Sequence, residues 1–225
     1  MANVIKLSNI CKHYVNNDQI LKVFDSADFE LKAAEMVALV APSGTGKSTM
    51  LHIAGLLEQP TSGEIFIHGE AVSHLSNNEK TKLRGREIGF VYQGNYLLPE
   101  FTALENIMMP LLIAGNSKEV AEGRAIKLLK YLKISDKIHS RPAEMSGGQK
   151  QRVAIARSIA NAPSMIFADE PTGNLDPKTA QIVFNIFTSL VRDVGISAII
   201  ATHNYSLAKQ MDRIITISES KIVEL

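Results

Sequence analysis

The chain has 225 residues, of which 45% are hydrophobic and 21% are charged, a balance that is ordinary for a folded globular protein and excludes a disordered one. With 24 Lys and Arg residues against 23 Asp and Glu residues, the net charge is +1, which gives no indication of binding to nucleic acid. A single cysteine, Cys11, excludes an internal disulfide and a cysteine-based metal cluster, and no uncharged apolar run reaches the ~20 residues that a membrane-spanning helix needs.

Loose alternation of apolar and polar residues predicts half-buried strands in the first seventy residues, at 4–14, 28–31 and 64–69. Residues 36–40 (MVALV) form a short apolar run, which predicts a buried strand. A loop rich in Pro and Gly follows, and then a helical stretch over residues 47–57. A buried strand, a glycine loop and a helix in this order are typical of the opening of an α/β unit.

Between about residues 94 and 160 the pattern becomes helical. Apolar residues recur there near a period of 3.6, with Lys and Glu between them, at Val120, Ile126, Leu129 and 132–133. Ser146 with Gln149 three residues later forms a capping box and predicts the start of another helix. These helices predict an insertion within the α/β pattern.

The α/β pattern returns near residue 165. Asp176 followed by Pro177 predicts a helix start, and Gly195 predicts its end. The buried stripe expected on this helix consists of Ile182, Val183, Ile186, Phe187, Leu190 and Val191. Strands are predicted at residues 165–168, 196–202, 213–217 and 221–225, with a short helix after the second of them. The predicted fold class is α/β, with a parallel-sheet core interrupted by a helical insertion.

The segment APSGTGKST, residues 41–49, has the context that a phosphate-binding loop requires, because it follows an apolar strand and opens a helix. Glycines let successive backbone N–H groups point at phosphate oxygens, and the helix adds its positive N-terminal end. Lys47 is expected to reach the β- and γ-phosphates, Ser48 to ligate Mg²⁺ and Thr49 to contact the α-phosphate. The predicted nucleotide contacts are Ser43, Gly44, Thr45, Gly46, Lys47, Ser48 and Thr49. The alternative is a Gly-rich turn before an ordinary helix.

One position departs from the phosphate-loop pattern, which begins with Gly where this chain has Ala41. If that position needs a positive φ, alanine costs on the order of 1 kcal/mol, which the rest of the loop can absorb.

Two carboxylates, Asp169 and Glu170, end the apolar strand at residues 165–168. In phosphate-loop enzymes an aspartate at such a strand end holds Mg²⁺ through its hydration shell. A neighbouring glutamate can polarise the attacking water. The alternative is a strand end with two solvated acids, which the phosphate loop disfavours.

Together these motifs resemble the nucleotide-binding subunit of an ABC transporter over essentially the whole chain. SGGQ, residues 146–149, lies 23 residues before Asp169 and resembles the family's LSGGQ signature, with Met145 in the place of Leu. A capping box alone would explain Ser146 and Gln149, but it needs neither Gly147 nor Gly148. The resemblance implies a single domain over 1–225 with the ABC ATPase fold. Its parts are a phosphate-loop core with a parallel sheet and an N-terminal antiparallel β subdomain (1–93 and 161–225) and a helical subdomain (94–160).

The resemblance also implies roles for four further positions. Tyr14 matches the aromatic residue that stacks on adenine. Gln93 matches the glutamine that links Mg²⁺ and water to the helical insertion, and His203 matches the histidine that contacts the γ-phosphate. Residues 175–176 match the loop that crosses between subunits. The implied cofactors are ATP and Mg²⁺, and the implied activity is ATP hydrolysis coupled to transport.

One copy of each motif implies half of a nucleotide sandwich. By the resemblance, two chains pair head to tail, so that the phosphate loop of one faces residues 146–149 of the other across ATP. A helix N-terminus with bare glycine amides is itself an anion site, which suits the γ-phosphate. The apolar segment 96–115 matches the groove that receives a cytoplasmic helix of a membrane permease subunit, and its alternative is the insertion's own core.

The segments YQGNYLLPEFTALENIMMPLLIAG and ADEPTGNLD resemble the branch of lipoprotein-releasing (LolD-type) ATPases. This implies a subunit that powers lipoprotein release, bound peripherally through membrane partners at the cytoplasmic face of a bacterial inner membrane. The alternatives are an FtsE-like cell-division ATPase and the ATPase of a MacB-like exporter. A soluble ABC ATPase acting on nucleic acid or ribosomes is disfavoured by the near-zero net charge and the single nucleotide-binding unit.

Overall fold

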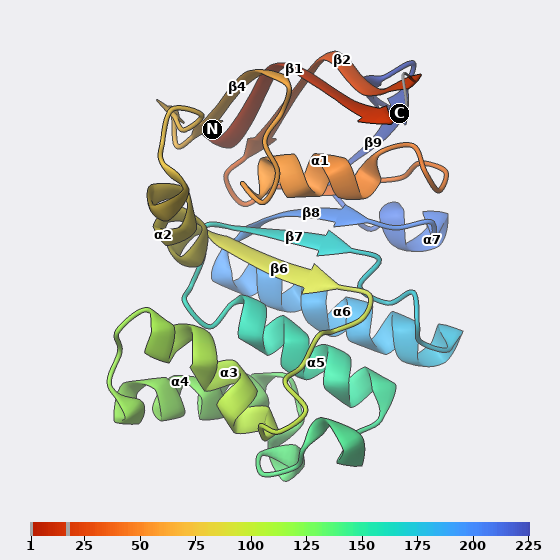
Figure 1. Ribbon diagram of the computed structural model, residues 1–225. Coiled ribbons are helices and arrows are strands. Elements are labelled where there is room, and N and C mark those ends of the chain that lie inside the picture. Colours follow the sequence, from red (N-terminus) through yellow and green to blue (C-terminus); the bar gives the residue numbers. More distant parts are fainter. Residues whose placement is uncertain (1, 17–18) are drawn as a thin grey trace.

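A computed structural model describes residues 2–16 and 19–225, and Figure 1 shows the arrangement of its elements. The strands are β1 (Asn3–Asn16), β2 (Gln19–Lys32), β3 (Met36–Leu39), β4 (Ser62–Ile67), β5 (Glu70–Ala71), β6 (Ile88–Tyr92), β7 (Met165–Asp169), β8 (Ser197–Ala201), β9 (Arg213–Ser218) and β10 (Lys221–Glu224). The helices are α1 (Lys47–Ala54), α2 (Asn77–Glu87), α3 (Ala103–Ile113), α4 (Lys118–Tyr131), α5 (Gly147–Ser158), α6 (Pro177–Val194) and α7 (Tyr205–Ala208), with short 3₁₀ turns at Ser135–Lys137 and Pro142–Glu144.

The strands form two sheets. One has the order β2-β1-β4-β5 and is antiparallel throughout. The other has the order β10-β9-β3-β8-β7-β6, in which all neighbours are parallel except β10 and β9. The predicted parallel-sheet core and antiparallel N-terminal sheet are therefore confirmed. Helices α3, α4 and α5 occupy the chain between β6 and β7, so the predicted helical insertion is present as well.

Both faces of the central strands β3, β8 and β7 are buried, which explains why these strands read as continuous apolar runs. In β3, Met36 and Ala38 join the hydrophobic cluster on the side of α3–α6, whereas Val37 and Leu39 join the cluster on the side of α1 and the antiparallel sheet. Strands β7 and β8 alternate in the same way. In Figure 1, α1 lies between the two sheets, and α5 and α6 cover the opposite face of the parallel sheet.

The helix predicted from Asp176 is confirmed, with Asp176 as its N-cap and Gly195 in the left-handed conformation at its end. Its buried stripe differs from the prediction, although Ile186 is partly buried and packs against the core as expected. Ile182 is half exposed, and Phe184 is buried in its place with Val183, Phe187, Leu190 and Val191. Contacts of α6 with the sheet and with α5 determine which of its residues are buried, and the periodicity of the sequence alone does not show where these contacts lie.

A similar difference affects α4. The helix is present, but Val120 and Ile126 are exposed, and the buried face also includes Ala121 and Ala125. Small residues on that face allow close approach of the neighbouring helices, so the buried stripe does not follow the largest apolar side chains.

Several elements of the structure are longer, shorter or additional relative to the predictions, among them the two-residue strand β5, which was not predicted. Strand β2 starts nine residues before the predicted 28–31, because its outer half pairs with β1 while both of its faces stay largely exposed, which removes the alternating pattern. Helix α1 ends at Ala54, before the predicted residue 57. Helix α2 and strand β6 were not predicted, although Ser76 and Glu79 form a capping box that marks the start of α2.

Asn106 is a fully buried amide that holds the loop before α3. Its Oδ1 accepts from the N–H of Leu98 at 2.8 Å, and its Nδ2 faces the carbonyl oxygens of Leu98, Phe101 and Thr102 at 3.0–3.1 Å. We expect Asn106→Ala to lower the free energy of unfolding by about 2–4 kcal/mol, because several partly buried backbone groups lose their partner. Urea unfolding measures this, with the exposed Asn116→Ala as control. A loss as small as that of the control would contradict it.

Candidate nucleotide-binding site

The parallel sheet brings the predicted site segments to one edge. Strands β3, β8, β7 and β6 are consecutive neighbours and parallel, so their carboxyl ends lie side by side. The phosphate loop follows β3, His203 follows β8, Asp169 and Glu170 end β7, and Gln93 follows β6. The carboxyl edge of such a sheet is where open α/β folds bind their ligands.

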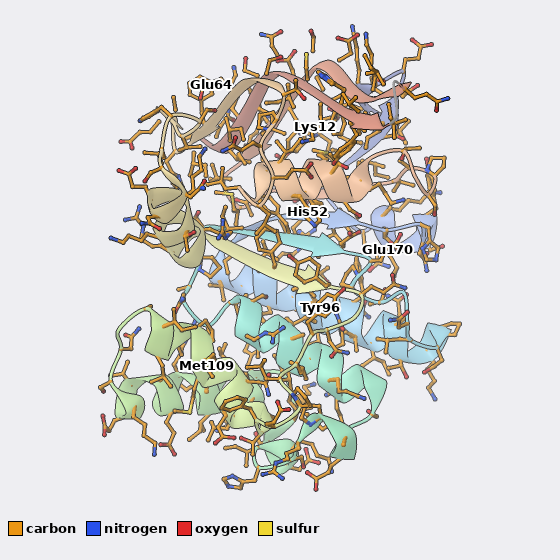
Figure 2. All side chains as sticks on the ribbon, in the orientation of Figure 1. Lys12, His52, Glu64, Tyr96, Met109 and Glu170 are labelled. Carbon is orange, nitrogen blue, oxygen red and sulfur yellow. The ribbon has the colours of Figure 1, made fainter. Side chains whose placement is uncertain are left out.

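A hollow of about 720 Å³ lies at this edge. The predicted site residues that line it are Tyr14, Ser43, Gly44, Gly46, Lys47, Ser48, Thr49, Gln93, Asp169 and Glu170. Figure 2 labels Glu170 at the end of β7 and Tyr96, which also lines the hollow, beyond the end of β6. Thr45 turns back to the loop, where its hydroxyl donates to the Pro42 carbonyl at 2.8 Å. His203 and residues 146–149 do not line the hollow.

The backbone of the phosphate loop depends on two glycines. Gly44 and Gly46 have φ values of 81° and 108°, and a Cβ on Gly46 would lie 2.4 Å from Val23 Cγ1. Lys47 Nζ donates to the carbonyls of Ala41 and Pro42 at 2.8 and 3.1 Å, which places the ammonium group against the loop. Ala41 does not adopt a positive φ, so the alanine at this position causes no backbone strain.

A hydroxyl group and a carboxylate lie in contact beside the phosphate loop. Ser48 Oγ donates to Asp169 Oδ2 at 2.6 Å, so a hydroxyl from α1 and a carboxylate from β7 lie in contact. Within residues 2–16 and 19–225 no group of three or more His, Cys, Asp or Glu side chains could hold a metal ion alone. A hydroxyl and a single carboxylate fit Mg²⁺ that is also held by phosphates and water, which is how Mg²⁺ is usually bound beside nucleotides.

Glu170 and His203 contact each other directly. Glu170 Oε2 accepts from His203 Nδ1 at 2.9 Å, and the Glu170 side chain is 17% exposed whereas that of His203 is 74% exposed. The backbone of Glu170 has φ 47°, an uncommon conformation for a residue other than glycine, and its N–H donates to the Ala201 carbonyl of β8 at 3.0 Å. Strand β8 therefore holds the backbone of Glu170, and His203 holds its carboxylate. No local pattern in the sequence indicated this contact.

Tyr14 is anchored by three side chains. Its hydroxyl donates to Glu58 Oε1 at 2.7 Å and lies 3.4 Å from Thr49 Oγ1, while Lys12 Nζ lies 4.9 Å from the ring centroid. Burial first, and then the neighbouring Glu58 carboxylate, raise the pKa of Tyr14 above its ordinary value. Burial alone would raise the pKa of Glu58, but hydrogen bonds from Lys12 and Tyr14 outweigh it and lower that pKa. Tyr14 thus presents a fixed ring at the hollow.

The loop after β6 is held by residues that the sequence analysis did not single out. Asn95 and Tyr96 both have positive φ, and Arg157 of α5 donates to their carbonyls at 2.7 Å each. Burial lowers the pKa of the Arg157 guanidinium from its ordinary value. An arginine among the apolar residues of α5 was the signal that could have revealed this contact. The helix that begins at residue 147 therefore holds the segment that follows Gln93.

The SGGQ segment begins α5 as predicted. Ser146 Oγ accepts from the Gln149 N–H at 3.3 Å and Gln149 Oε1 accepts from the Ser146 N–H at 2.8 Å, so the capping box is confirmed. The glycines also have a packing role, since a Cβ on Gly148 would lie 2.5 Å from Thr179 Cγ2 and one on Gly147 would lie 3.2 Å from Leu175 Cδ2. Ser146 and Gly147 are exposed and lie outside the hollow of their own chain.

Comparison with known proteins agrees with this geometry. Residues 24–173 match the family described as ABC transporter, so the chain belongs to that family and is an ABC-type ATPase. It is 51% identical over 222 residues to the lipoprotein-releasing system ATP-binding protein LolD 2 of Rhodopseudomonas palustris strain ATCC BAA-98 / CGA009, with 99% of this chain and 96% of the relative covered. It is 52% identical, with the same coverage, to LolD of Rhodopseudomonas palustris strain BisB5.

Solved structures show the same fold. The dimeric ATP-binding cassette MJ0796 in a post-hydrolysis state with ADP and Pi matches with a TM-score of 0.89 and 37% identity, covering 98% of this chain and 97% of that one. Another dimeric structure of MJ0796 matches with a TM-score of 0.88 and 38% identity, covering 97% and 96%. The predicted ABC ATPase fold is confirmed.

Proposed function

We propose that this chain is the ATP-hydrolysing subunit of a lipoprotein-releasing transporter at the cytoplasmic face of a bacterial inner membrane. The observation that carries the proposal is the 51% identity, over 99% of the chain, to a lipoprotein-releasing system ATP-binding protein. The edge of the parallel sheet supports the chemistry, because phosphate-loop, carboxylate and amide side chains line one hollow there.

In this proposal the nucleotide lies in the hollow, with adenine stacked on Tyr14 and the phosphates along residues 43–49. Lys47 moves its ammonium group from the loop carbonyls to the β- and γ-phosphates, which supply stronger acceptors. Ser48, Asp169 and Gln93 hold Mg²⁺, directly or through water. When bound, the metal ion neutralises charge that develops on the phosphates.

Glu170 orients the attacking water for in-line displacement, and His203 contacts the γ-phosphate. The hydrogen bond between these two side chains joins Glu170, which orients the water, to His203, which lies beside the γ-phosphate. Because β8 holds the Glu170 backbone and His203 holds its carboxylate, little reorganisation is needed once the nucleotide is bound.

We further propose that two copies close over ATP, with residues 146–149 of one chain against the γ-phosphate bound by the other. This agrees with the exposure of Ser146 and Gly147 and with their position outside the hollow of their own chain. MJ0796 forms dimers. Hydrolysis removes the charge that joins the two surfaces, and the dimer opens.

Residues 94–160 form, in this proposal, a helical subdomain that receives a permease helix. Four apolar side chains around α3 are exposed: Tyr96, Leu98, Leu112 and Ile113. Figure 2 labels Tyr96 beyond β6 and Met109 on α3, within the segment 96–115. In the described part of the chain no helix has both the length and the apolarity needed to cross a bilayer.

The proposal is tested by purifying the tagged chain with its membrane partners and reconstituting the complex in vesicles that hold a lipoprotein. We expect ATP-dependent transfer of the lipoprotein to a soluble acceptor, and no transfer with a Glu170→Gln complex. A complex that contains only a division-site membrane protein, or one that exports small molecules and leaves the lipoprotein in place, would replace lipoprotein release with one of the sister functions.

A further inference from the structure

Gln93 and Asn174 form a reciprocal pair of amides at the rim of the hollow. Gln93 Nε2 donates to Asn174 Oδ1 at 2.8 Å, and Asn174 Nδ2 donates to the backbone carbonyl of Gln93 at 3.2 Å. The two residues lie 81 positions apart in the sequence, one after β6 and the other after β7, and both line the hollow.

The second of these bonds fixes the direction of both amides. The Gln93 carbonyl can only accept, so Asn174 must turn its NH₂ group toward the backbone and its oxygen toward the Gln93 side chain. Gln93 must then offer its NH₂ group to that oxygen. The oxygen of the Gln93 amide is left without a hydrogen bond to the described part of the chain.

Gly173 holds the Gln93 amide from another side. A Cβ on Gly173 would lie 2.8 Å from Gln93 Nε2 and 3.1 Å from Cδ, and the φ of Gly173 is not positive. The backbone therefore packs directly on the amide, and an alanine at this position would add a steric contact without backbone strain.

We propose that Asn174 is a positioning residue that makes Gln93 present its amide oxygen to Mg²⁺. This rests on the proposed function, in which Gln93 is a metal ligand. Mg²⁺ takes oxygen ligands, and an amide nitrogen cannot replace one. Without Asn174 the Gln93 amide can rotate, and its NH₂ group faces the metal position for part of the time. Because Asn174 directly precedes residues 175–176, the same pair also joins the metal ligand to the loop expected to contact the second subunit.

The test compares the affinity for a non-hydrolysable ATP analogue in Mn²⁺, used in place of Mg²⁺, with the affinity in EDTA. The increase in affinity that Mn²⁺ produces is called the metal effect. We expect Asn174→Ala to reduce this increase by roughly three- to tenfold, the contribution of one hydrogen bond, and to leave the affinity in EDTA unchanged. Gly173→Ala should reduce it in the same way, since its Cβ displaces the Gln93 amide.

Two further variants separate the possible outcomes. Asn185→Ala is the matched control, because Asn185 Oδ1 accepts from Gln181 Nε2 at 2.7 Å on the exposed face of α6, and it should behave as the parent chain. If Gln93→Ala reduces the metal effect and Asn174→Ala does not, the positioning role is wrong and the proposed function stands. If Gln93→Ala keeps the full metal effect, Gln93 is not a ligand, and both statements about the metal are overturned.

Discussion

A Glu170→Gln chain is expected to bind ATP with the parent affinity, to hydrolyse it about 10²–10⁴-fold more slowly, and to accumulate as a dimer. Glutamine keeps the size of the side chain and its contact with His203, but it cannot accept a proton from water. The closed dimer then persists because the γ-phosphate that joins the two chains is not removed. Phosphate release measures the rate, and size-exclusion chromatography with ATP measures the dimer.

Glu219→Gln, an exposed carboxylate in the turn between β9 and β10, is the control and should keep both the parent rate and the parent oligomeric state. Hydrolysis by Glu170→Gln at the parent rate would show that another group orients the water. Slow hydrolysis without a dimer would separate the chemical role of Glu170 from the proposed closure.

The second large effect concerns Ser146. Asp is as good an N-cap as Ser, so Ser146→Asp should leave α5 folded while it places a negative charge where the γ-phosphate of the opposite chain would bind. We expect Ser146→Asp alone and Lys47→Ala alone to be nearly inactive, and their mixture to recover activity. In a mixed dimer one site combines the intact phosphate loop of one chain with the intact residue 146 of the other. With random pairing the recovery is up to about a quarter of the parent activity.

Ser117→Asp supplies the control, because Ser117 caps α4 by accepting from the Val120 N–H, away from the hollow, and the change should leave ATP hydrolysis unaffected. ATP hydrolysis by each chain alone and by the mixture decides the outcome. A mixture that stays as inactive as its components, although the chains exchange partners, would mean that each ATP is held within one copy.

The buried sheet and the phosphate loop could be predicted from local sequence. The segment MVALV followed by GTGKST predicts a buried strand, a phosphate loop and a helix, because each of these parts has a distinctive composition and they follow one another closely in the chain. The capping residues Ser146 and Asp176 act within three residues of themselves, so they too could be read locally. The identities of the buried residues on α4 and α6 could not, since Ile126 and Ile182 are exposed where a neighbouring element does not reach them.

The residue types of the site and their order along the chain could be predicted without coordinates, because phosphate and metal chemistry restrict which side chains can serve. The contacts between these side chains depend on the folded arrangement of the strands. The parallel order of β3, β8, β7 and β6 places Ser48 against Asp169, Glu170 against His203 and Gln93 against Asn174. These pairs join residues 33 to 121 positions apart, and a contact at such a separation depends on strand order and register, which no local pattern encodes.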